Sequence, residues 1–386
     1  MTSITRQLSS MLILSLLVLS LLFCDTIDDR IDEGVDYATA VRNQMIEEIF
    51  EVLGDLGRFP DLDRVEEKFN RNQISVPDSI PVTKRIELRL YFRPDDLVRA
   101  ARNGYTLTAG FLIATGFDPD FLDRDSFTPL LIGARNGHYE IVDLLIRNGA
   151  DIEWPDEDGI TPLRYAQLFQ HHSVVELLLQ HGAQVNRRDR YRWTPLLSAV
   201  ANNDPDMVDL LLQHGANPEL KTTRGDYPLI EAIYQRNERI VSLLLKGGAD
   251  PDVRDVRYDL PAIFLVIEEN NLRLVTELIE AGANLEIREP QFKETPLIRG
   301  VKLGFAEIVE ILLREEAEVN AVDDNGWSPL FYALAAGSYH LTDKLLEHGC
   351  DPNLTDNNGR TALSLWNWRI DEDLRELVST ALESQR

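Results

Sequence analysis

The sequence predicts an all-α fold, a solenoid of about nine helix-turn-helix units with a mainly helical N-terminal cap. Two markers that recur at one spacing carry this prediction. The first is a triplet like Thr128-Pro129-Leu130, and its copies start at residues 128, 161, 194, 227, 260, 295, 328 and 361, each 33 residues after the last except for 35 between 260 and 295. The second is a Gly-Ala pair near the end of the unit, at residues 149, 182, 215, 248 and 282, with Gly349-Cys350 in register. A period shared by two markers indicates stacked repeats.

Each unit has the sequence pattern of two helices joined by a turn. Proline at the first helical position loses no hydrogen bond, and the threonine before it caps the helix. A second helix follows from an apolar stripe such as Ile141, Val142, Leu144 and Leu145, which lie on one helical face. Glycine after the stripe permits the left-handed residue that ends a helix. The polar segment beyond it, which we call the finger, crosses to the next unit.

These triplets, pairs and spacings resemble the ankyrin repeat family, over about three quarters of the chain, residues 95–386. The resemblance implies non-catalytic protein binding through the finger turns and the exposed, concave face of each first helix. It extends to exported bacterial ankyrin proteins, some of which protect or organise envelope proteins. The histidine usual after Thr-Pro-Leu is absent, so we expect apolar packing to replace its hydrogen bond between repeats. The residues at this position are Leu131, Arg164, Leu197, Ile230, Ile298 and Phe331.

Two departures from the pattern predict local changes. Of the two extra residues between 260 and 295, we place one in the helical hairpin between Ala262 and Val275 and the other in the finger from Asn284 to Glu294. Glu316-Ala317 replaces the Gly-Ala pair of its unit. We therefore expect a strained or reshaped helix end there.

Residues 1–24 are predicted to be an export signal. Arg6 precedes an apolar run from Met11 to Phe23, and acidic residues follow at once. Cys24 stands where bacterial lipoproteins carry their lipidated cysteine, although bulky Phe23 replaces the usual small residue. Three outcomes stay open, namely lipidation of Cys24, cleavage to a soluble protein, and retention as a membrane anchor. Each would place the repeats outside the cytoplasm, in the periplasm or cell envelope.

Residues 25–94 are predicted to be a linker and an N-terminal cap. We expect, in order, an acidic linker at 25–36, helices at 37–53 and 62–69, an extended or turning segment at 74–81, and a short strand within 85–92. Residues 95–125 have the register of a degenerate first repeat, since 128 − 33 = 95. The unit from Thr361 ends in a polar segment that suits a carboxy-terminal cap, which Trp366 and Trp368 would seal.

Composition excludes several function classes. The formal net charge of −26 over 386 residues disfavours nucleic acid and suits a soluble monomer. The two cysteines, Cys24 and Cys350, provide no disulfide framework. The sequence contains no phosphate-binding glycine loop, nucleophile elbow or zinc-protease motif. We therefore predict neither an enzyme nor a bound cofactor.

The histidines and acidic turns are predicted to be structural. His181, His214 and His348 precede the glycine that ends the second helix, where a donor favours the helix carboxy end. No cysteine or histidine cluster has zinc spacing, so we predict no metal site. The finger residues 156–158 are acidic, and solvated turn carboxylates are favoured there over a weak calcium site.

Aromatic and basic residues occupy the positions that the resemblance marks as variable, and these are the candidate protein-binding residues. They are Arg190, Tyr191, Trp193, Arg224, Arg257, Tyr258 and Phe292 on fingers, with Leu168, Phe169 and Tyr234 at first-helix ends. Residues 184–193 carry four arginines and one aspartate, next to five acidic residues in 151–160. The structural alternative is that Trp193, Tyr227 and Trp327 pack over neighbouring turns while Arg187 to Arg192 pair with acidic neighbours.

The sequence thus predicts an exported, envelope-associated scaffold that binds an unidentified protein partner and touches the membrane only through its N-terminal signal or lipid. The alternative is a membrane-tethered structural spacer without a specific partner. A catalytic role would have to lie in residues 25–94.

Overall fold

The computed structural model describes residues 45–50, 53, 56, 62–71, 85, 88, 91–366 and 371–384. These residues form helices and turns, and the only β-pairing among them is two isolated bridges. The all-α repeat class is therefore confirmed. The chain divides into two compact units, Met1–Glu157 and Asp158–Arg386, called here the amino-terminal and carboxy-terminal units.

The amino-terminal unit packs helices from both sides of residue 95. Its named helices are α4 (Leu62–Arg71), α6 (Asp96–Asn103), α7 (Thr106–Ala114), α8 (Pro129–Asn136) and α9 (Tyr139–Arg147). The helix α4 packs against α7, and the Tyr105 hydroxyl donates a hydrogen bond to Asp63. The predicted helix at 62–69 is confirmed and runs two residues further. Residues 45–50, inside the predicted helix at 37–53, are also helical.

The strand expected within 85–92 is wrong, because Arg85 and Leu88 are helical. Leu88 is fully buried, and the ring of Phe92 packs on Phe111 with their centroids 5.5 Å apart. Leu88 and Phe92 are four residues apart, a spacing that suits one face of a helix. The alternation of apolar residues at 86, 88 and 90 favoured a strand, so the sequence fitted both patterns. The segments predicted at 1–24, 25–36 and 74–81 lie outside the described residues, as does Trp368.

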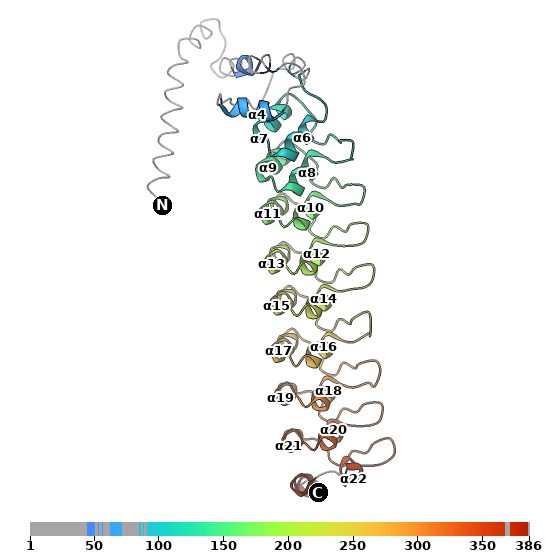
Figure 1. The fold of residues 1–386 in the computed structure, drawn as a ribbon. Helices are drawn as coiled ribbons and strands as arrows, with labels where there is room; N and C mark the ends of the chain where they lie inside the picture. Colours follow the sequence, from blue (N-terminus) through green and yellow to red (C-terminus); the bar gives the residue numbers. More distant parts are fainter. Residues whose placement is uncertain are drawn as a thin grey trace, which may run out of the picture. The chain divides into compact units, whose positions relative to one another are not determined.

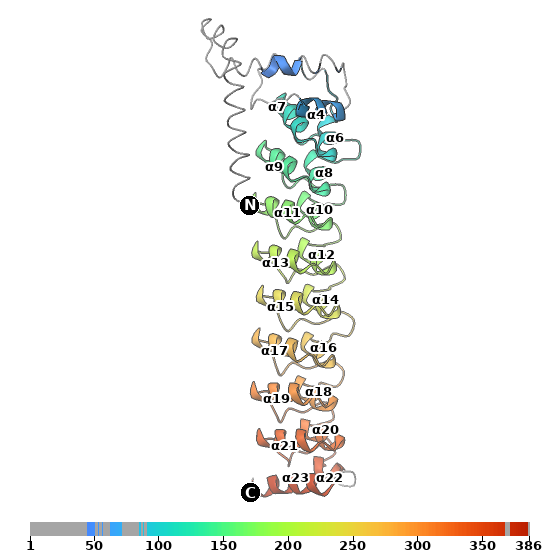
Figure 2. The same ribbon diagram turned by 60° about the vertical axis from the view of Figure 1, so that its left-hand side comes forward.

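The carboxy-terminal unit repeats one helix pair along its length. The first helices are α10 (Pro162–Leu168), α12 (Pro195–Ala201), α14 (Pro228–Tyr234), α16 (Ala262–Glu268), α18 (Pro296–Leu303), α20 (Pro329–Ala336) and α22 (Ala362–Trp366). The second helices are α11 (His172–Gln180), α13 (Pro205–Gln213), α15 (Glu238–Lys246), α17 (Leu272–Glu280), α19 (Ala306–Arg314), α21 (Tyr339–Glu347) and α23 (Glu372–Ser384). Within this unit, first and second helices form two rows, and the fingers project on the first-helix side (Figure 1). Figure 2 shows the same two rows from a second direction.

The predicted helix starts are confirmed except at Pro261, where the helix begins one residue later, at Ala262. The side chains of Thr161, Thr194 and Thr295 accept hydrogen bonds of 3.1–3.3 Å from the backbone N–H three residues further on. Proline follows each threonine at the first helical position. The hydroxyl of Ser328, in the same position, is buried without a hydrogen-bond partner.

Apolar packing at the position after the triplet is confirmed with one exception. Leu197, Ile230, Ile298 and Phe331 are buried there, as Leu131 is in the amino-terminal unit. Arg164 is buried too, but its guanidinium donates to Gln167 and lies 3.9 Å from an oxygen of Asp189. Burial lowers the pKa of Arg164 to about 10 and the Asp189 carboxylate opposes this, because burial disfavours a charge that a nearby anion stabilises.

The extra residue expected between Ala262 and Val275 lies in the preceding finger instead. The first and second helices start ten residues apart at Ala262 and Leu272, as they do at Pro228 and Glu238. The Asp255 N–H donates to Leu260 O, five residues on, whereas Asp189 donates to Trp193, four residues on. The second insertion, in finger 284–294, is confirmed, since Glu289 donates to Glu294. A helix pair packed on both sides resists insertion more than a projecting loop does.

The strained helix end expected at Glu316 is confirmed. Its φ of 63° lies in the left-handed region, which disfavours a residue with a Cβ. Ala317 N–H still donates to Leu312 O, the bond that Ala283 makes to Leu278 in the preceding repeat. The backbone therefore keeps the glycine-type ending and accepts strain at Glu316.

Candidate functional site

A side-chain acceptor at one recurring position holds each finger. Asp189 Oδ1 accepts hydrogen bonds of 2.9 Å from the backbone N–H groups of both Tyr191 and Trp193. The acceptors at the equivalent positions are Asp123, Thr222, Asp255, Glu289, Asp323 and Asp356. Sequence reasoning missed this set, although an acidic residue recurring with the repeat period was a usable signal. The carboxylates at these positions point into the finger rather than away from it.

A second row of side chains links neighbouring repeats. Asn186 Oδ1 accepts from Asn217 N–H at 2.7 Å, and Glu219 Oε1 accepts from Asp250 N–H at 2.9 Å. The same contact joins Asp252 to Asn284, Glu286 to Glu318 and Asn320 to Asp351. Many acidic side chains thus serve as acceptors for turn N–H groups, so the net charge of the chain does not describe the finger tips.

Arg190, Tyr191 and Trp193 lie on one finger but differ in their surroundings. Tyr191 is 53% exposed, whereas Trp193 is half-buried. The Arg190 guanidinium lies 4.8 Å from the Tyr191 ring centroid, donates to its hydroxyl at 2.7 Å, and forms an ion pair with Asp158. The structural alternative therefore describes Arg190, which is paired with an acidic neighbour.

Tyr234, Arg257 and Tyr258 meet around the inward carboxylate of Asp255. Tyr234 donates its hydroxyl to Asp255 Oδ2 at 3.0 Å, and Arg257 lies 5.6 Å from the Tyr234 ring centroid. Burial, reinforced by the hydrogen bond to Asp255, raises the pKa of Tyr234 to about 12. Tyr258 is 71% exposed at the tip of the same finger. The hydrogen-bonded side chains of Tyr234 and Asp255 therefore form an ordered support, from which the Tyr258 ring projects.

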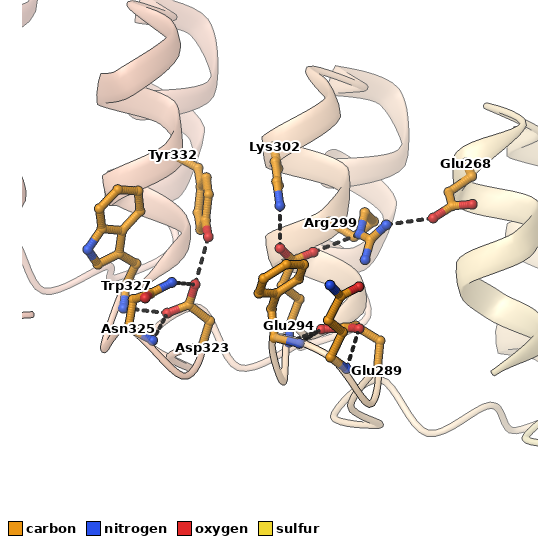
Figure 3. A network of polar contacts seen from close by, with 11 residues as sticks. Glu268, Glu289, Glu294, Arg299, Lys302, Asp323, Asn325, Trp327 and Tyr332 are labelled. Atoms are coloured by element: carbon orange, nitrogen blue, oxygen red, sulfur yellow. Dashed lines mark hydrogen bonds and ion pairs between the residues drawn. The ribbon is translucent and has the colours of Figure 1, made fainter. Parts of the chain in front are cut away.

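Phe292 lies beside a charged and aromatic network, whose members Glu294, Lys302 and Tyr332 are shown in Figure 3. Lys302 Nζ lies 5.3 Å from the Phe292 ring centroid and 2.5 Å from Glu294 Oε1. The fully buried Glu294 also pairs with Arg299 at 2.7 Å. Tyr332 donates to Asp323 at 2.6 Å, and burial together with this carboxylate raises the pKa of Tyr332 well above its usual range. Phe292 thus packs against a set of side chains that ion pairs hold in place.

The remaining candidates lie at separate places. Phe169 ends α10 and stacks on Tyr165 and His171, with ring centroids 6.4 and 6.5 Å away. Arg224 is exposed on the finger that precedes α14. Trp327 packs on Phe331 and Tyr332 of the helix that follows it, whereas the structural alternative placed it over a neighbouring turn. The described contacts therefore group the candidates by finger rather than around a single pocket.

Groups with reactive chemistry are few in the part of the chain that the structure describes. No three or more histidine, cysteine, aspartate or glutamate side chains there could hold a metal ion. Cys350 is buried, which raises the pKa of its thiol to about 12 and leaves little thiolate at neutral pH. His181, His214 and His348 follow the last residue of α11, α13 and α21. None of the described helices is long and apolar enough to cross a membrane. The lipidation candidate Cys24 lies outside the described residues.

Stacked helix pairs with projecting fingers define a repeat protein of the kind that presents an extended binding surface. The family profile described as "Ankyrin repeats (3 copies)" matches residues 97–189, 187–255 and 263–365. The chain therefore belongs to the ankyrin repeat family. Ankyrin repeats in general serve as scaffolds for protein–protein interaction.

Several curated proteins share part of this repeat sequence. The "Probable 26S proteasome regulatory subunit p28" of Saccharomyces cerevisiae is 38% identical over 87 residues, which is 22% of this chain and 38% of that protein. The "2-5A-dependent ribonuclease" of Mus musculus is 39% identical over 69 residues, 18% of this chain and 9% of that protein. "Glycerophosphocholine phosphodiesterase gde1" of Schizosaccharomyces pombe is 36% identical over 84 residues, 22% of this chain and 7% of that protein. The chain thus spans well under half the length of these relatives.

Proposed function

We propose that this chain is a non-catalytic scaffold that captures a protein partner on the finger face of its carboxy-terminal unit. The finger face is defined here as the fingers and the carboxy ends of the first helices. One observation carries the proposal. Of the large apolar and aromatic side chains that are exposed in the described part of this unit, all but Tyr339 lie on that face. They are Leu168, Phe169, Tyr191, Tyr234, Val256, Tyr258, Phe292 and Leu303.

The chemistry of these side chains suits a binding surface. Aromatic residues and arginine dominate the residues that contribute most to protein interfaces. Exposed apolar side chains that gather on one face indicate an interaction site more strongly than scattered ones do. The hydrogen-bonded and ion-paired side chains beside Tyr258 and Phe292 hold these fingers in place, which limits the conformational entropy lost on binding.

We also propose that the repeats act outside the cytoplasm, because residues 1–24 combine a basic start, an apolar run and Cys24. The tether would be a lipid on Cys24 or the retained signal, and a cleaved signal would leave the protein free in the periplasm. The rival function, a structural spacer, needs the tether but no specific finger residues.

Crosslinking in intact cells tests the scaffold against the spacer. We expect the double variant Tyr191→Ala and Tyr258→Ala to lower capture of the main crosslinked protein at least about tenfold, since two exposed aromatic contacts are removed. The matched control is Tyr139→Ala with Tyr339→Ala, which removes two exposed tyrosines at the starts of second helices. Control capture should stay within about twofold of the parent.

Equal capture by both variants, with unchanged thermal unfolding, would favour the spacer. Fractionation of the same cells reports the location. Recovery of the chain in the cytoplasmic fraction would contradict the export proposal while leaving the binding surface untouched.

A further inference from the structure

Consecutive fingers of the carboxy-terminal unit present arginine side chains without carboxylate partners. We define the basic ridge as Arg188, Arg192, Arg224 and Arg257, from the fingers at 187–193, 221–226 and 254–259. None of these guanidinium groups forms an ion pair or hydrogen bond with another described residue, and Arg257 only lies over the Tyr234 ring. Arg192, Arg224 and Arg257 are exposed, and Arg188 is half-buried. The ridge is therefore a row of uncompensated positive charges.

The carboxylates at the recurring acceptor position do not neutralise the ridge from outside. The Asp189 side chain is 7% exposed and Asp255 is 2% exposed, because both accept backbone N–H groups of their own turns. In the finger between them the acceptor is the neutral Thr222. The fingers at 187–193 and 254–259 thus direct the carboxylate at the acceptor position inward, and the exposed Asp259 of the second finger lies 3.6 Å from Arg254 rather than beside a ridge arginine.

Two of the three ridge fingers also lack a backbone contact that the finger at 187–193 makes from Arg190 N–H to Asp158 O at 3.2 Å. The N–H after the finger acceptor usually donates to the preceding finger, as Asp324 does to Phe292 O at 2.9 Å and Asn357 does to Asn325 O at 3.1 Å. The equivalent N–H groups of Thr223 and Val256 have no acceptor within the described part of the chain. Two unoccupied donors therefore lie beside the arginines.

The distance between neighbouring ridge fingers determines how far apart the anionic groups of a ligand must be. A Cβ built on Gly225 would lie 3.2 Å from Val256 Cγ2, so these neighbouring fingers touch. Packed helices of neighbouring repeats lie about 8–10 Å apart. An extended chain covers about 10 Å in three residues.

We propose that the basic ridge binds an extended acidic segment of a partner protein, with a carboxylate at about every third residue. This inference rests on the proposed scaffold function and names the chemistry of the partner. Arginine pairs with carboxylates through paired hydrogen bonds, and the free N–H groups of Thr223 and Val256 can donate to the same oxygens. Apolar side chains between the carboxylates would contact Tyr191, Val256 and Tyr258.

A short acidic segment fits the ridge better than a nucleic acid does. Phosphates continue at close spacing along a polynucleotide, so the ligand would extend beyond the ridge. Beyond the ridge on one side stands the exposed carboxylate of Asp324, and on the other side stands that of Asp158, which is paired with Arg190. These charges would repel a long polyanion, whereas an acidic peptide of suitable length ends before it reaches them.

Fluorescence anisotropy with the full chain tests the inference. The probe is a labelled peptide of about ten residues with glutamate at every third position and leucine or serine between, and its matched partner has glutamine for glutamate. The ridge variant combines Arg188→Gln, Arg192→Gln and Arg224→Gln. The control combines Arg239→Gln, Arg273→Gln and Arg314→Gln, which removes the same charge from exposed ion pairs on second helices.

We expect the ridge variant to raise the Kd for the acidic peptide at least about tenfold, and the control to change it less than about twofold. The glutamine peptide should bind at least about tenfold more weakly, and added salt should weaken the acidic peptide. Equal affinity of the parent and ridge variant, with both folded by circular dichroism, would overturn the inference.

Other occupants give different results. Tighter binding of a single-stranded oligonucleotide of equal charge, lost in the ridge variant, would assign the ridge to nucleic acid and overturn the inference. Dimers detected by light scattering and lost in that variant would assign the ridge to a second copy of the chain and overturn the inference.

If capture in cells depends on Tyr191 and Tyr258 but the acidic peptide does not bind, the scaffold function stands and this inference fails. If the peptide binds through the ridge while capture ignores both tyrosines, the proposed function fails instead.

Discussion

The fingers of the basic ridge and the fingers at 321–327 and 355–360 use the same turn in different ways. In both regions one side chain at the recurring position accepts the backbone N–H groups of its own finger. The later fingers also bond tip to tip, through Asp324 and Asn357, and Arg360 pairs with Asp356. Of the ridge fingers, those at 221–226 and 254–259 lack this tip bond, which Arg190 N–H makes to Asp158 O in the finger at 187–193, and the four arginines of the ridge have no carboxylate partner among the described residues. A turn design that is uniform along the chain can therefore serve structure in one place and recognition in another.

The finger at 289–294 lies between these two regions and shows how they are separated. Pro290 occupies the position of Thr223, Val256 and Asp324 but has no N–H, so it cannot bond to the preceding finger. The ion pairs of Glu294 with Arg299 and Lys302 anchor this finger to α18 (Figure 3). Phe292 O then accepts from Asp324 N–H, and the next finger continues this contact from Asn357 N–H to Asn325 O.

The largest expected effect comes from removing that anchor. Glu294→Gln leaves Arg299 and Lys302 without their shared carboxylate in a buried position. Because both cations are partly exposed, we expect the free energy of unfolding to fall by about 2 kcal/mol rather than the larger loss typical of a buried pair. Denaturant unfolding monitored by circular dichroism measures the loss.

Glu268→Gln is the matched control, because Glu268 binds the same Arg299 from an exposed position. Its effect should stay within about 0.5 kcal/mol. Equal losses in the two variants would show that burial of Glu294 does not distinguish the finger at 289–294.

Hydrogen exchange should show a smaller difference between the two regions. The N–H groups of Asp324 and Asn357 are hydrogen-bonded to preceding fingers, whereas those of Thr223 and Val256 are not bonded within the described residues. We expect at least about tenfold slower exchange for the bonded pair, after correction for intrinsic rates. Site-resolved exchange by NMR on one sample provides the comparison. Equal protection of all four amides would remove the distinction between tied and untied fingers.

The smallest expected effect is that of acid on the finger at 355–360. The hydrogen bond from Arg360 lowers the pKa of Asp356 to about 2, whereas Thr222 does not titrate in this range. A depressed carboxyl pKa contributes stability above the ordinary aspartate pKa, and that contribution is lost as the pH falls through about 2. Amide shifts at Asn358 and Arg360 should therefore change near pH 2, while the shift at Arg224, whose acceptor is the Thr222 hydroxyl, should show no transition centred there. The variant Asp356→Asn should abolish this transition, and a transition that persists in the variant would assign it to another group.

Sequence reasoning located the repeats because a short motif reports on local physics. Thr194 caps a helix and Pro195 starts it wherever the helix lies, so the period of the triplet predicted the helix pairs. The same reasoning misplaced one insertion. Pro261 precedes the helix instead of starting it, and α16 begins at Ala262. Aligning the repeats by their prolines therefore placed this repeat one residue too early. The helix start is set by packing against the neighbouring repeats, not by the proline.

The candidate residues were predicted only as a set of exposed aromatic and basic side chains. Tyr191 and Tyr258 do project from fingers, and their roles in binding stay predictions. The sequence could not separate Arg190, which pairs with Asp158, from Arg192, which has no such partner. Both are arginines in one basic run, and ion pairing depends on which carboxylate lies nearby in space.

The amino-acid sequence by itself determined the repeat length, the helix pairs and the residue types at the finger tips, because capping, periodicity and turn chemistry act within a few residues. Only the tertiary structure decided which charges face the solvent. Turn N–H groups need acceptors when they are shielded from water, and Asp189 and Asp255 satisfy them from inside their fingers. That pairing withdraws the carboxylates from the surface and leaves the arginines of the ridge exposed, in a chain whose net charge is −26.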